Sequence, residues 1–255
     1  MSNYLINSLT KKKSIGIKSL AILIDPDHLK VKNLEKILLE AQKCQVDYFF
    51  VGGSLILQDR LEESIKLIRE LTKTPIILFP GSGFQISQQA DALLFLSLVS
   101  GRNADFLIGK QVEIAPKLYH TKLEIIPTAY LLIDGKQSNT AAYISQTQPI
   151  PRDKPEIAVA TVLAAQFLGM KLVYLDAGSG ALALVSEEMI SKVSNVIDVP
   201  LIVGGGIKDG LSATKVLNSG ADLIVVGNAI EENPKLIQEM SYAVHGGNPV
   251  ELMMN

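Results

Sequence analysis

The chain has no tryptophan, one cysteine and few aromatic residues, which make up 5% of its 255 residues. With Cys44 as the single cysteine, no disulfide can form within the chain, and a cystine-stabilised fold is excluded. Cys44 lies in a helical pattern, and we predict a buried, inert thiol. This cysteine usage is typical of a reducing compartment, so we expect a cytoplasmic protein.

The chain also lacks both an excess of charge and a long apolar run. The formal net charge is −2, whereas a nucleic-acid-binding protein would need a basic face. The longest apolar run, residues 92–99, has the length of a strand and falls well short of the roughly 18 residues of a membrane span. The N-terminus is polar and basic and has no signal-peptide core. We therefore expect a soluble protein without a nucleic-acid partner or a transmembrane segment.

Glycine, by contrast, gathers at the ends of apolar segments. Residues 199–208 and 221–228 each contain a short, β-branched run that ends abruptly in glycine. Such runs are typical of strands buried on both faces of a parallel sheet. A helix opening follows each run, and helix N-termini offer unpaired N–H donors and partial positive charge to an anion. Because the phosphate site of (β/α)8 barrels follows strands seven and eight, we predict the last quarter of such a barrel.

The preceding residues repeat this alternation of strand and helix. We expect strands near residues 19–24, 48–51, 75–79, 92–98, 124–133 and 172–175, and helices near residues 31–45, 61–71, 104–118, 155–169 and 187–195. With a short N-terminal helix covering one end, the chain forms a single α/β domain over residues 1–255, a (β/α)8 TIM barrel; alternating units also allow an open doubly wound sheet.

Two segments depart from the alternation. Residues 134–153 are rich in polar residues, glycine and proline, and a connection of this length is a functional or a disordered loop. The last helix starts near residue 230 and frays after residue 244 into a polar tail at about residues 246–255.

Polar side chains follow the predicted strands at their carboxyl ends, where barrels carry their active sites. Asp25 and Asp27 come directly after the first strand, and Ser54 follows the second. Hard oxygen ligands of this kind suit Mg²⁺, which takes one or two carboxylates together with substrate phosphates. Asp27 could equally cap the next helix. We expect Asp25 to be a metal ligand.

The richest strand end lies in residues 174–180. Alternation places Tyr174 and Asp176 on the same side of the strand, where a phenol and a carboxylate suit binding or deprotonation of a substrate hydroxyl. The glycines of residues 178–180 offer further N–H donors to an anion. Three such glycine loops on consecutive strands, the others being at residues 205–206 and 227–228, favour a phosphorylated ligand.

The opposite side of the barrel mouth is apolar. Strands three and four and their loops carry Phe79, Phe84, Leu94, Leu96 and Phe106, most of which we assign to core packing. A polar half that faces an apolar half favours substrates with one charged and one apolar end. The histidines add little: we expect His120 and His245 at the surface and His28 near the mouth, without metal-ligand spacing.

Taken in order, these strand-end motifs cover nearly the whole chain. They are Asp25-Pro26-Asp27, Val51-Gly52-Gly53-Ser54, Phe79-Pro80-Gly81-Ser82, Ile126-Pro127-Thr128-Ala129-Tyr130, Tyr174-Leu175-Asp176-Ala177-Gly178-Ser179-Gly180-Ala181, Val203-Gly204-Gly205-Gly206-Ile207 and Val226-Gly227-Asn228. The chain resembles the geranylgeranylglyceryl phosphate synthase family, including its PcrB-type bacterial members. The resemblance implies transfer of a prenyl group, most simply geranylgeranyl, from its diphosphate to the 3-hydroxyl of sn-glycerol 1-phosphate, in ether phospholipid synthesis.

The resemblance also implies roles for individual residues. Mg²⁺ would be held by Asp25 and Ser54, and the prenyl diphosphate would lie beside Phe79, Tyr130 and Phe106. Asp176 and Tyr174 would be catalytic, with Asp176 acting as the base or orienting a water. Glycerol phosphate would be held by Tyr174, Leu175, Asp176, Ala177, Gly178, Ser179, Gly180, Gly205, Gly206, Gly227 and Asn228.

The chain departs from many archaeal members at three places. Asp176 stands where they carry Glu, residues 103–106 stand where they carry a Trp, and His28 stands where Lys is frequent. The prenyl length is left open, and Phe106 could make the groove deeper or wider. We expect a homo-oligomer, dimer or hexamer, because the helix at residues 158–165 is apolar, and the lipid product implies transient membrane contact.

Other interpretations of the strand ends remain. A phosphosugar isomerase or synthase of the same fold would need a strand-end lysine or a Cys/Asp acid–base pair, which this chain does not show. A flavin-binding barrel would be yellow. A non-catalytic isoprenoid-binding protein would need no Mg²⁺, and the Asp25 and Ser54 pair argues against it.

Overall fold

The computed structural model describes residues 3–27, 31–53, 60–82, 85–137 and 139–246. Its parallel strands form a closed barrel in sequence order, and β8 pairs with β1. The strands are β1 (Ser19–Ile24), β2 (Tyr48–Val51), β3 (Ile76–Leu78), β4 (Ala92–Leu98), β5 (Glu124–Leu132), β6 (Leu172–Asp176), β7 (Leu201–Gly204) and β8 (Leu223–Val226). The prediction of a (β/α)8 barrel is confirmed, and the open-sheet alternative is wrong.

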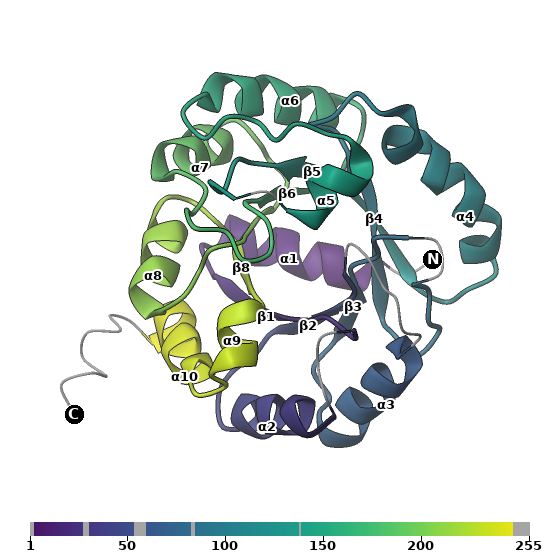
Figure 1. The fold of residues 1–255 in the computed structure, drawn as a ribbon, viewed down its shortest axis with the longest axis vertical. Helices are drawn as coiled ribbons and strands as arrows, with labels where there is room; N and C mark the ends of the chain where they lie inside the picture. The colour runs from purple at the N-terminus through teal and green to yellow at the C-terminus, as the bar shows by residue number, and fades with distance from the viewer. Residues whose placement is uncertain (1–2, 28–30, 54–59, 83–84, 138, 247–255) are drawn as a thin grey trace.

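Most of the helices form a ring around the barrel (Figure 1). The α-helices of the described residues, including the two that lie over the ends of the barrel, are α1 (Tyr4–Ser14), α2 (Val31–Gln42), α3 (Leu61–Leu71), α4 (Lys110–Tyr119), α5 (Thr140–Ser145), α6 (Pro155–Phe167), α7 (Glu187–Ser194), α8 (Gly210–Asn218), α9 (Asn228–Glu232) and α10 (Leu236–Ser241). One apolar core lies between this ring and the strands. A second core fills the inside of the barrel, so each strand is buried on both faces, as its β-branched composition predicts.

Helix α1 closes the amino-terminal end of the barrel. Its Leu5 and Leu9 belong to the interior core, together with inward-facing side chains such as Phe50. Glu124, at the start of β5 and 3% exposed, accepts hydrogen bonds from the N–H groups of Leu5 and Ile6, both at 2.8 Å. The carboxylate thereby satisfies two N–H groups that a helix N-terminus leaves unpaired and complements the helix dipole. The expected N-terminal cover is confirmed.

Ion pairs at the other end of α1 attach it to the strand starts. Lys12 Nζ lies 2.6 Å from Asp47 Oδ1, and Lys13 Nζ lies 3.1 Å from Asp222 Oδ2. His245, expected at the surface, instead lies with Nε2 3.1 Å from Asp47 Oδ2. Burial acts to raise the pKa of Asp47, but its contacts with His245 and Lys12 outweigh burial and hold that pKa below its ordinary value.

The segment predicted as one helix over residues 104–118 begins as a π-helical turn, Asp105–Gly109. Side chains donate hydrogen bonds to several backbone carbonyls around this turn. Ser97 Oγ donates to the carbonyl of Leu107 at 2.8 Å, and Gln111 Nε2 donates to the carbonyls of Leu96 and Phe106. The N–H of Lys110 bonds to the carbonyl of Asp105, five residues back.

The long connection after β5 is built around helix α5. Asn139 caps this helix by accepting a hydrogen bond from the N–H of Ala142 at 2.7 Å, and Ile150 returns to pair with the end of β5. Of the two possibilities left by the sequence, the structure favours the functional loop, since α5 reaches the barrel mouth (Figure 1). Between β3 and β4, by contrast, the described residues 79–82 and 85–91 contain no helix.

Two smaller expectations are corrected. The last helix is divided into α9, α10 and a π-helical turn, Tyr242–Gly246, because Pro234 cannot donate the N–H that a continuous helix needs. Cys44 lies beyond the end of α2 and is half-buried rather than fully buried. Burial raises the pKa of its thiol, which agrees with low reactivity.

Replacing Glu124 tests the role of α1 as a cover. Glu124→Gln puts an amide NH2 where one of two N–H groups now finds an acceptor, and we expect a loss of about 1–3 kcal/mol in the free energy of unfolding. Urea denaturation measures the effect. Glu70→Gln is the control, because Glu70 is exposed and its ion pair with Lys66 is long, at 4.0 Å. The free energy of unfolding of this variant should change by no more than roughly 0.5 kcal/mol. Equal losses in the two variants would contradict the role of Glu124.

Candidate functional site

A cavity of about 530 Å³ lies at the carboxyl ends of the strands. Each strand that lines it contributes through its last residues or the loop that follows, as expected for a barrel whose parallel strands all end at one rim. The lining side chains and glycines include Asp25, Asp27, Gly53, Phe79, Tyr130, Asn139, Tyr174, Asp176, Gly178, Ser179, Gly180, Gly205, Gly206, Lys208, Gly227 and Asn228. The structure thus brings most of the predicted site residues together.

The central polar group is the carboxylate of Asp176, which is 9% exposed at the end of β6. Tyr130 Oη, from the neighbouring strand β5, donates to Asp176 Oδ2 at 2.5 Å, and the N–H of Gly178 donates to Oδ1 at 2.7 Å. Burial raises the pKa of Asp176 above its ordinary value, although both hydrogen bonds act to lower it. A carboxylate with a raised pKa is a better proton acceptor near neutral pH.

Tyr174 lies on the side of β6 that the sequence predicts. It lines the same cavity as Asp176, as alternation predicts, but the phenol that bonds the carboxylate belongs to Tyr130. The Tyr174 ring stacks on Phe79 with centroids 5.4 Å apart and meets Tyr130 edge-on at 5.5 Å. A Cβ at Gly204 would lie 2.5 Å from Tyr174 Oη, so only glycine fits beside this phenol.

The glycine loops after β6, β7 and β8 meet on one side of the cavity. Ser179 Oγ donates to Asn228 Oδ1 at 3.0 Å, which joins the first loop to the third. Gly205 has φ +82°, and a Cβ there would lie 2.7 Å from the backbone nitrogen of Gly178. The N–H groups of Gly205, Gly206 and Asn228 donate to no other described residue. Backbone N–H groups without a protein acceptor, in neighbouring glycine loops, are suited to binding an anion.

Two of the residues predicted to hold the phosphorylated ligand have side chains that point away from the cavity. Leu175 and Ala177 have their side chains buried in the outer core, between the barrel and the helices. Neither side chain lines the cavity. The alternation that points Tyr174 and Asp176 inward turns these two outward, so only their backbone atoms could contribute to binding.

Of the predicted metal ligands Asp25 and Ser54, the structure describes Asp25, and Ser54 lies outside the described residues. His28, expected near the mouth, also lies outside them. Asp25 Oδ1 accepts the N–H of Asp27 at 3.0 Å, so its carboxylate is held in the cavity. A Cβ on Gly53 would lie 2.6 Å from Asp25 Oδ2, so the close approach of this carboxylate to the backbone requires glycine at position 53. The described residues contain no group of three or more acidic, His or Cys side chains placed to hold a metal. One carboxylate with phosphate oxygens and water still fits Mg²⁺.

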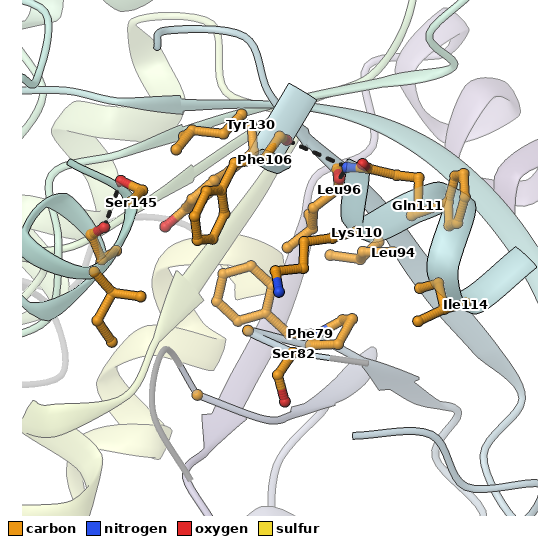
Figure 2. A pocket seen from close by; sticks show the side chains of 17 residues that line it. Phe79, Ser82, Leu94, Leu96, Phe106, Lys110, Gln111, Ile114, Tyr130 and Ser145 are labelled. Carbon is orange, nitrogen blue, oxygen red and sulfur yellow. Dashed lines mark hydrogen bonds between the residues drawn. The ribbon is translucent and has the colours of Figure 1, made fainter. Parts of the chain in front are cut away.

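A narrower apolar groove, of about 100 Å³, adjoins the cavity, and Figure 2 shows the side chains that line it. Phe79, Tyr130 and Ala141 line both spaces. The groove continues from β4 toward helix α4, and its lining there includes Leu94, Phe95, Leu96, Leu98, Phe106, Lys110, Gln111 and Ile114. The predicted apolar half, apart from Phe84, which is outside the described residues, is therefore assembled as one groove. In Figure 2 the Lys110 side chain extends toward Phe79, and Ser82 is drawn next to Phe79.

Helix α5 supplies the part of the site that sequence reasoning missed. Asn139 and Thr140 line the cavity, Ala141 lines both spaces, and Ile144 lines the groove. A signal was present: Asn139 followed by helix-forming residues is a typical N-cap pattern. The pattern gives no indication, however, of where such a short helix lies relative to the barrel.

Together, the fold and the site define a (β/α)8-barrel enzyme with an anion pocket joined to an apolar groove and a buried carboxylate beside the junction. No helix among the described residues is long and apolar enough to cross a bilayer. Over residues 12–244 the chain matches the PcrB family, and it belongs to that family.

Named relatives and solved structures agree. The chain is 48% identical to a geranylgeranylglyceryl phosphate synthase of Chitinophaga pinensis, over 98% of this chain and 99% of that protein. It is 45% identical to one of Pyrococcus furiosus, over 82% and 83%. The crystal structure of (S)-3-O-geranylgeranylglyceryl phosphate synthase from Thermoplasma acidophilum in complex with its substrate sn-glycerol-1-phosphate superposes with a TM-score of 0.88 at 34% identity, over 94% of this chain and 98% of that one.

Removing the Tyr130 hydroxyl tests the carboxylate environment. In Tyr130→Phe, Asp176 loses a donor that favours its ionised form, so its pKa should rise further above its ordinary value. Carbon-13 NMR of protein labelled at aspartate carboxyls measures the titration, and Asp176→Asn assigns the signal by its disappearance. Tyr174→Phe is the comparison, since its hydroxyl does not bond the carboxylate. An unchanged or lower pKa in Tyr130→Phe would refute the assignment.

Proposed function

We propose that the protein joins a prenyl diphosphate to the 3-hydroxyl of sn-glycerol 1-phosphate, forming an ether and releasing diphosphate. The observation that supports this most is the junction of the two spaces at Tyr130, which lines the anion cavity and the apolar groove and bonds Asp176. An enzyme that joins a polar phosphate to an apolar chain needs both compartments to meet at its acid–base group.

In this proposal the glycine loops bind the phosphate of the glycerol phosphate. The free N–H groups of Gly205, Gly206 and Asn228 face no protein acceptor among the described residues, and Lys208 adds a positive charge to the cavity lining. The bound glycerol then extends toward Asp176. The same family arrangement supports the choice of sn-glycerol 1-phosphate, because the relative from Thermoplasma acidophilum was solved with that substrate.

Bond formation requires that the glycerol hydroxyl lose its proton as its oxygen attacks the allylic carbon. Asp176, directly or through a water that it orients, accepts this proton, and its raised pKa suits the task. The bond from the allylic carbon to the diphosphate oxygen breaks, and the electron pair leaves with diphosphate. Phe79, Tyr130 and Tyr174 pack against one another at the junction, where aromatic faces stabilise positive charge on the allylic carbon.

Asp25 is the residue that we propose for Mg²⁺, together with Ser54 as the family resemblance implies. The ion, when bound, neutralises the charge that grows on the leaving diphosphate. Asp25 lies beside Gly53, which lines both the cavity and the groove, so a metal held there would be close to the head of a prenyl diphosphate.

The proposal is tested by incubating the protein with radiolabelled sn-glycerol 1-phosphate and geranylgeranyl diphosphate, in Mg²⁺ or in EDTA. We expect label to pass into the organic phase in Mg²⁺ and to stay in water in EDTA. The sn-glycerol 3-phosphate enantiomer is the control for specific recognition. If no label is transferred with geranylgeranyl diphosphate or with any longer prenyl donor, the proposal is refuted. That result would favour a phosphosugar enzyme or an isoprenoid carrier.

Asp25→Asn tests the metal role. Loss of one charge at the proposed Mg²⁺ ligand should lower kcat by about 100-fold or more, while the dissociation constant for glycerol phosphate stays near the wild-type value. Steady-state kinetics over a range of Mg²⁺ concentrations measure both. The matched control is Asp27→Asn, because Asp27 lines the same cavity. An Asp25→Asn protein with full activity at low Mg²⁺ would exclude Asp25 as the ligand.

Phe106→Ala tests the groove as the site of the prenyl chain. Removing a ring from the groove lining should shift the preference toward longer donors, because each added methylene can then be buried. Competition between geranylgeranyl and longer prenyl diphosphates measures the shift. Ile108→Ala, in the same π-helical turn but 60% exposed, should leave the preference unchanged. The same preference in both variants and wild type would place the chain elsewhere.

We also propose a cytoplasmic homo-oligomer that contacts membranes transiently when it releases its lipid product. The support for oligomerisation is an exposed apolar patch on and just after α6, where Ile157, Phe167 and Leu168 are 48%, 80% and 79% exposed. Light scattering of the purified protein distinguishes monomer, dimer and hexamer.

A further inference from the structure

The two polar atoms of the Asn139 side chain, Oδ1 and Nδ2, differ in their hydrogen bonding. Its Oδ1 accepts the N–H of Ala142 at 2.7 Å and so caps α5. Because a backbone N–H can only donate, the atom that faces Ala142 must be the amide oxygen, and this assigns the other end as Nδ2. Nδ2 is buried and has no hydrogen-bond partner among the described residues.

Asn139 belongs to the polar end of the reaction site. Asn139 lines the large cavity together with Tyr174, Asp176 and Ser179. A Cβ at Gly178 would lie 2.7 Å from Asn139 Nδ2, and Gly178 itself donates its N–H to Asp176 Oδ1. The free amide hydrogens are therefore next to the loop that holds the buried carboxylate.

A buried amide donor without an acceptor costs free energy, and native proteins keep few such groups unless a ligand satisfies them. Water is one possible acceptor. The proposed substrates, however, bring oxygen acceptors into this same cavity, and charged phosphate oxygens form the stronger hydrogen bonds with amide donors.

We infer that Asn139 is a substrate-binding residue, whose Nδ2 donates a hydrogen bond to an oxygen of the bound glycerol phosphate. The inference rests on the proposed function. It assigns to one side chain both the cap of α5 and a contact with the polar substrate. Because Ala141 and Ile144 of α5 line the prenyl groove, this contact links the position of the groove wall to the polar substrate.

Two substitutions separate the contact from the cap. Asn139→Ser keeps a good N-cap residue but removes the NH2 group. Asn139→Asp keeps the cap and places a negative charge where the donor was. We expect glycerol phosphate to bind about 10-fold more weakly to Asn139→Ser and about 100-fold more weakly to Asn139→Asp, since the second change adds repulsion to the lost hydrogen bond.

Isothermal titration calorimetry of the full chain with sn-glycerol 1-phosphate, and then with inorganic phosphate, measures these affinities. Ser186→Ala is the control, because Ser186 caps α7 through the N–H of Met189 at 3.3 Å and does not line the cavity. It should bind like wild type. Weakening toward both ligands identifies a phosphate oxygen as the acceptor, and weakening toward glycerol phosphate alone identifies a hydroxyl. Either result supports the inference.

Wild-type affinity in both Asn139 variants, with wild-type protein that binds glycerol phosphate, would overturn this inference and leave the proposed function intact. A wild-type protein that fails to bind glycerol phosphate would overturn both. Thermal melting of each variant shows whether a weakened affinity reflects unfolding, and a variant with a wild-type melting temperature and wild-type affinity counts against the contact.

Discussion

The arrangement of the site depends on one constraint, the burial of the Asp176 carboxylate. A charge removed from water needs hydrogen-bond donors, or it shifts its pKa until it becomes neutral. Here the donors come from two directions, the Tyr130 hydroxyl on the adjacent strand and the N–H of Gly178 in the following loop. To provide them, Tyr130 of β5 must lie beside β6, and the loop after β6 must turn back sharply enough to reach the end of its own strand. The residue that holds the buried carboxylate, Tyr130, is thereby also part of the wall of the apolar groove.

The apolar groove exists because the described helices cover the barrel unevenly. The described residues between β3 and β4 form no helix, while the π-helical turn before α4 is held by Ser97 and Gln111 side chains rather than by regular helical hydrogen bonds. Helix α5, brought to the mouth by the long connection after β5, adds Ala141 and Ile144 to the opposite wall. An apolar space of this form needs three irregular features at once, each of which would be a defect in a regular barrel.

The opposite end of the barrel carries stability instead of chemistry. Glu124 fastens the start of α1, and Lys12 and Lys13 fasten its end to Asp47 and Asp222. These partners lie far apart in the sequence, so they connect the chain's first residues to its middle and its last strand. The raised pKa of Asp176 works in the other direction: ionisation of a group whose folded pKa exceeds its unfolded value reduces stability as the pH rises through the folded pKa. The contacts of α1 at the amino-terminal end of the barrel offset this loss of folding free energy at the rim that carries the site.

The sequence by itself determined the barrel, the rim and the membership of a family. Strand burial on two faces shows directly in β-branched runs, and a residue at a strand end must lie at the rim because all strands are parallel. Asp25, Asp176 and the loops at residues 205–206 and 227–228 were found in this way. Only the tertiary structure decided which phenol bonds Asp176, that Leu175 and Ala177 face outward to the core, that α5 lies over the mouth, and that Asn139 keeps a free donor there. Such contacts depend on strand register and on the path of long connections, and no local pattern of residues encodes either.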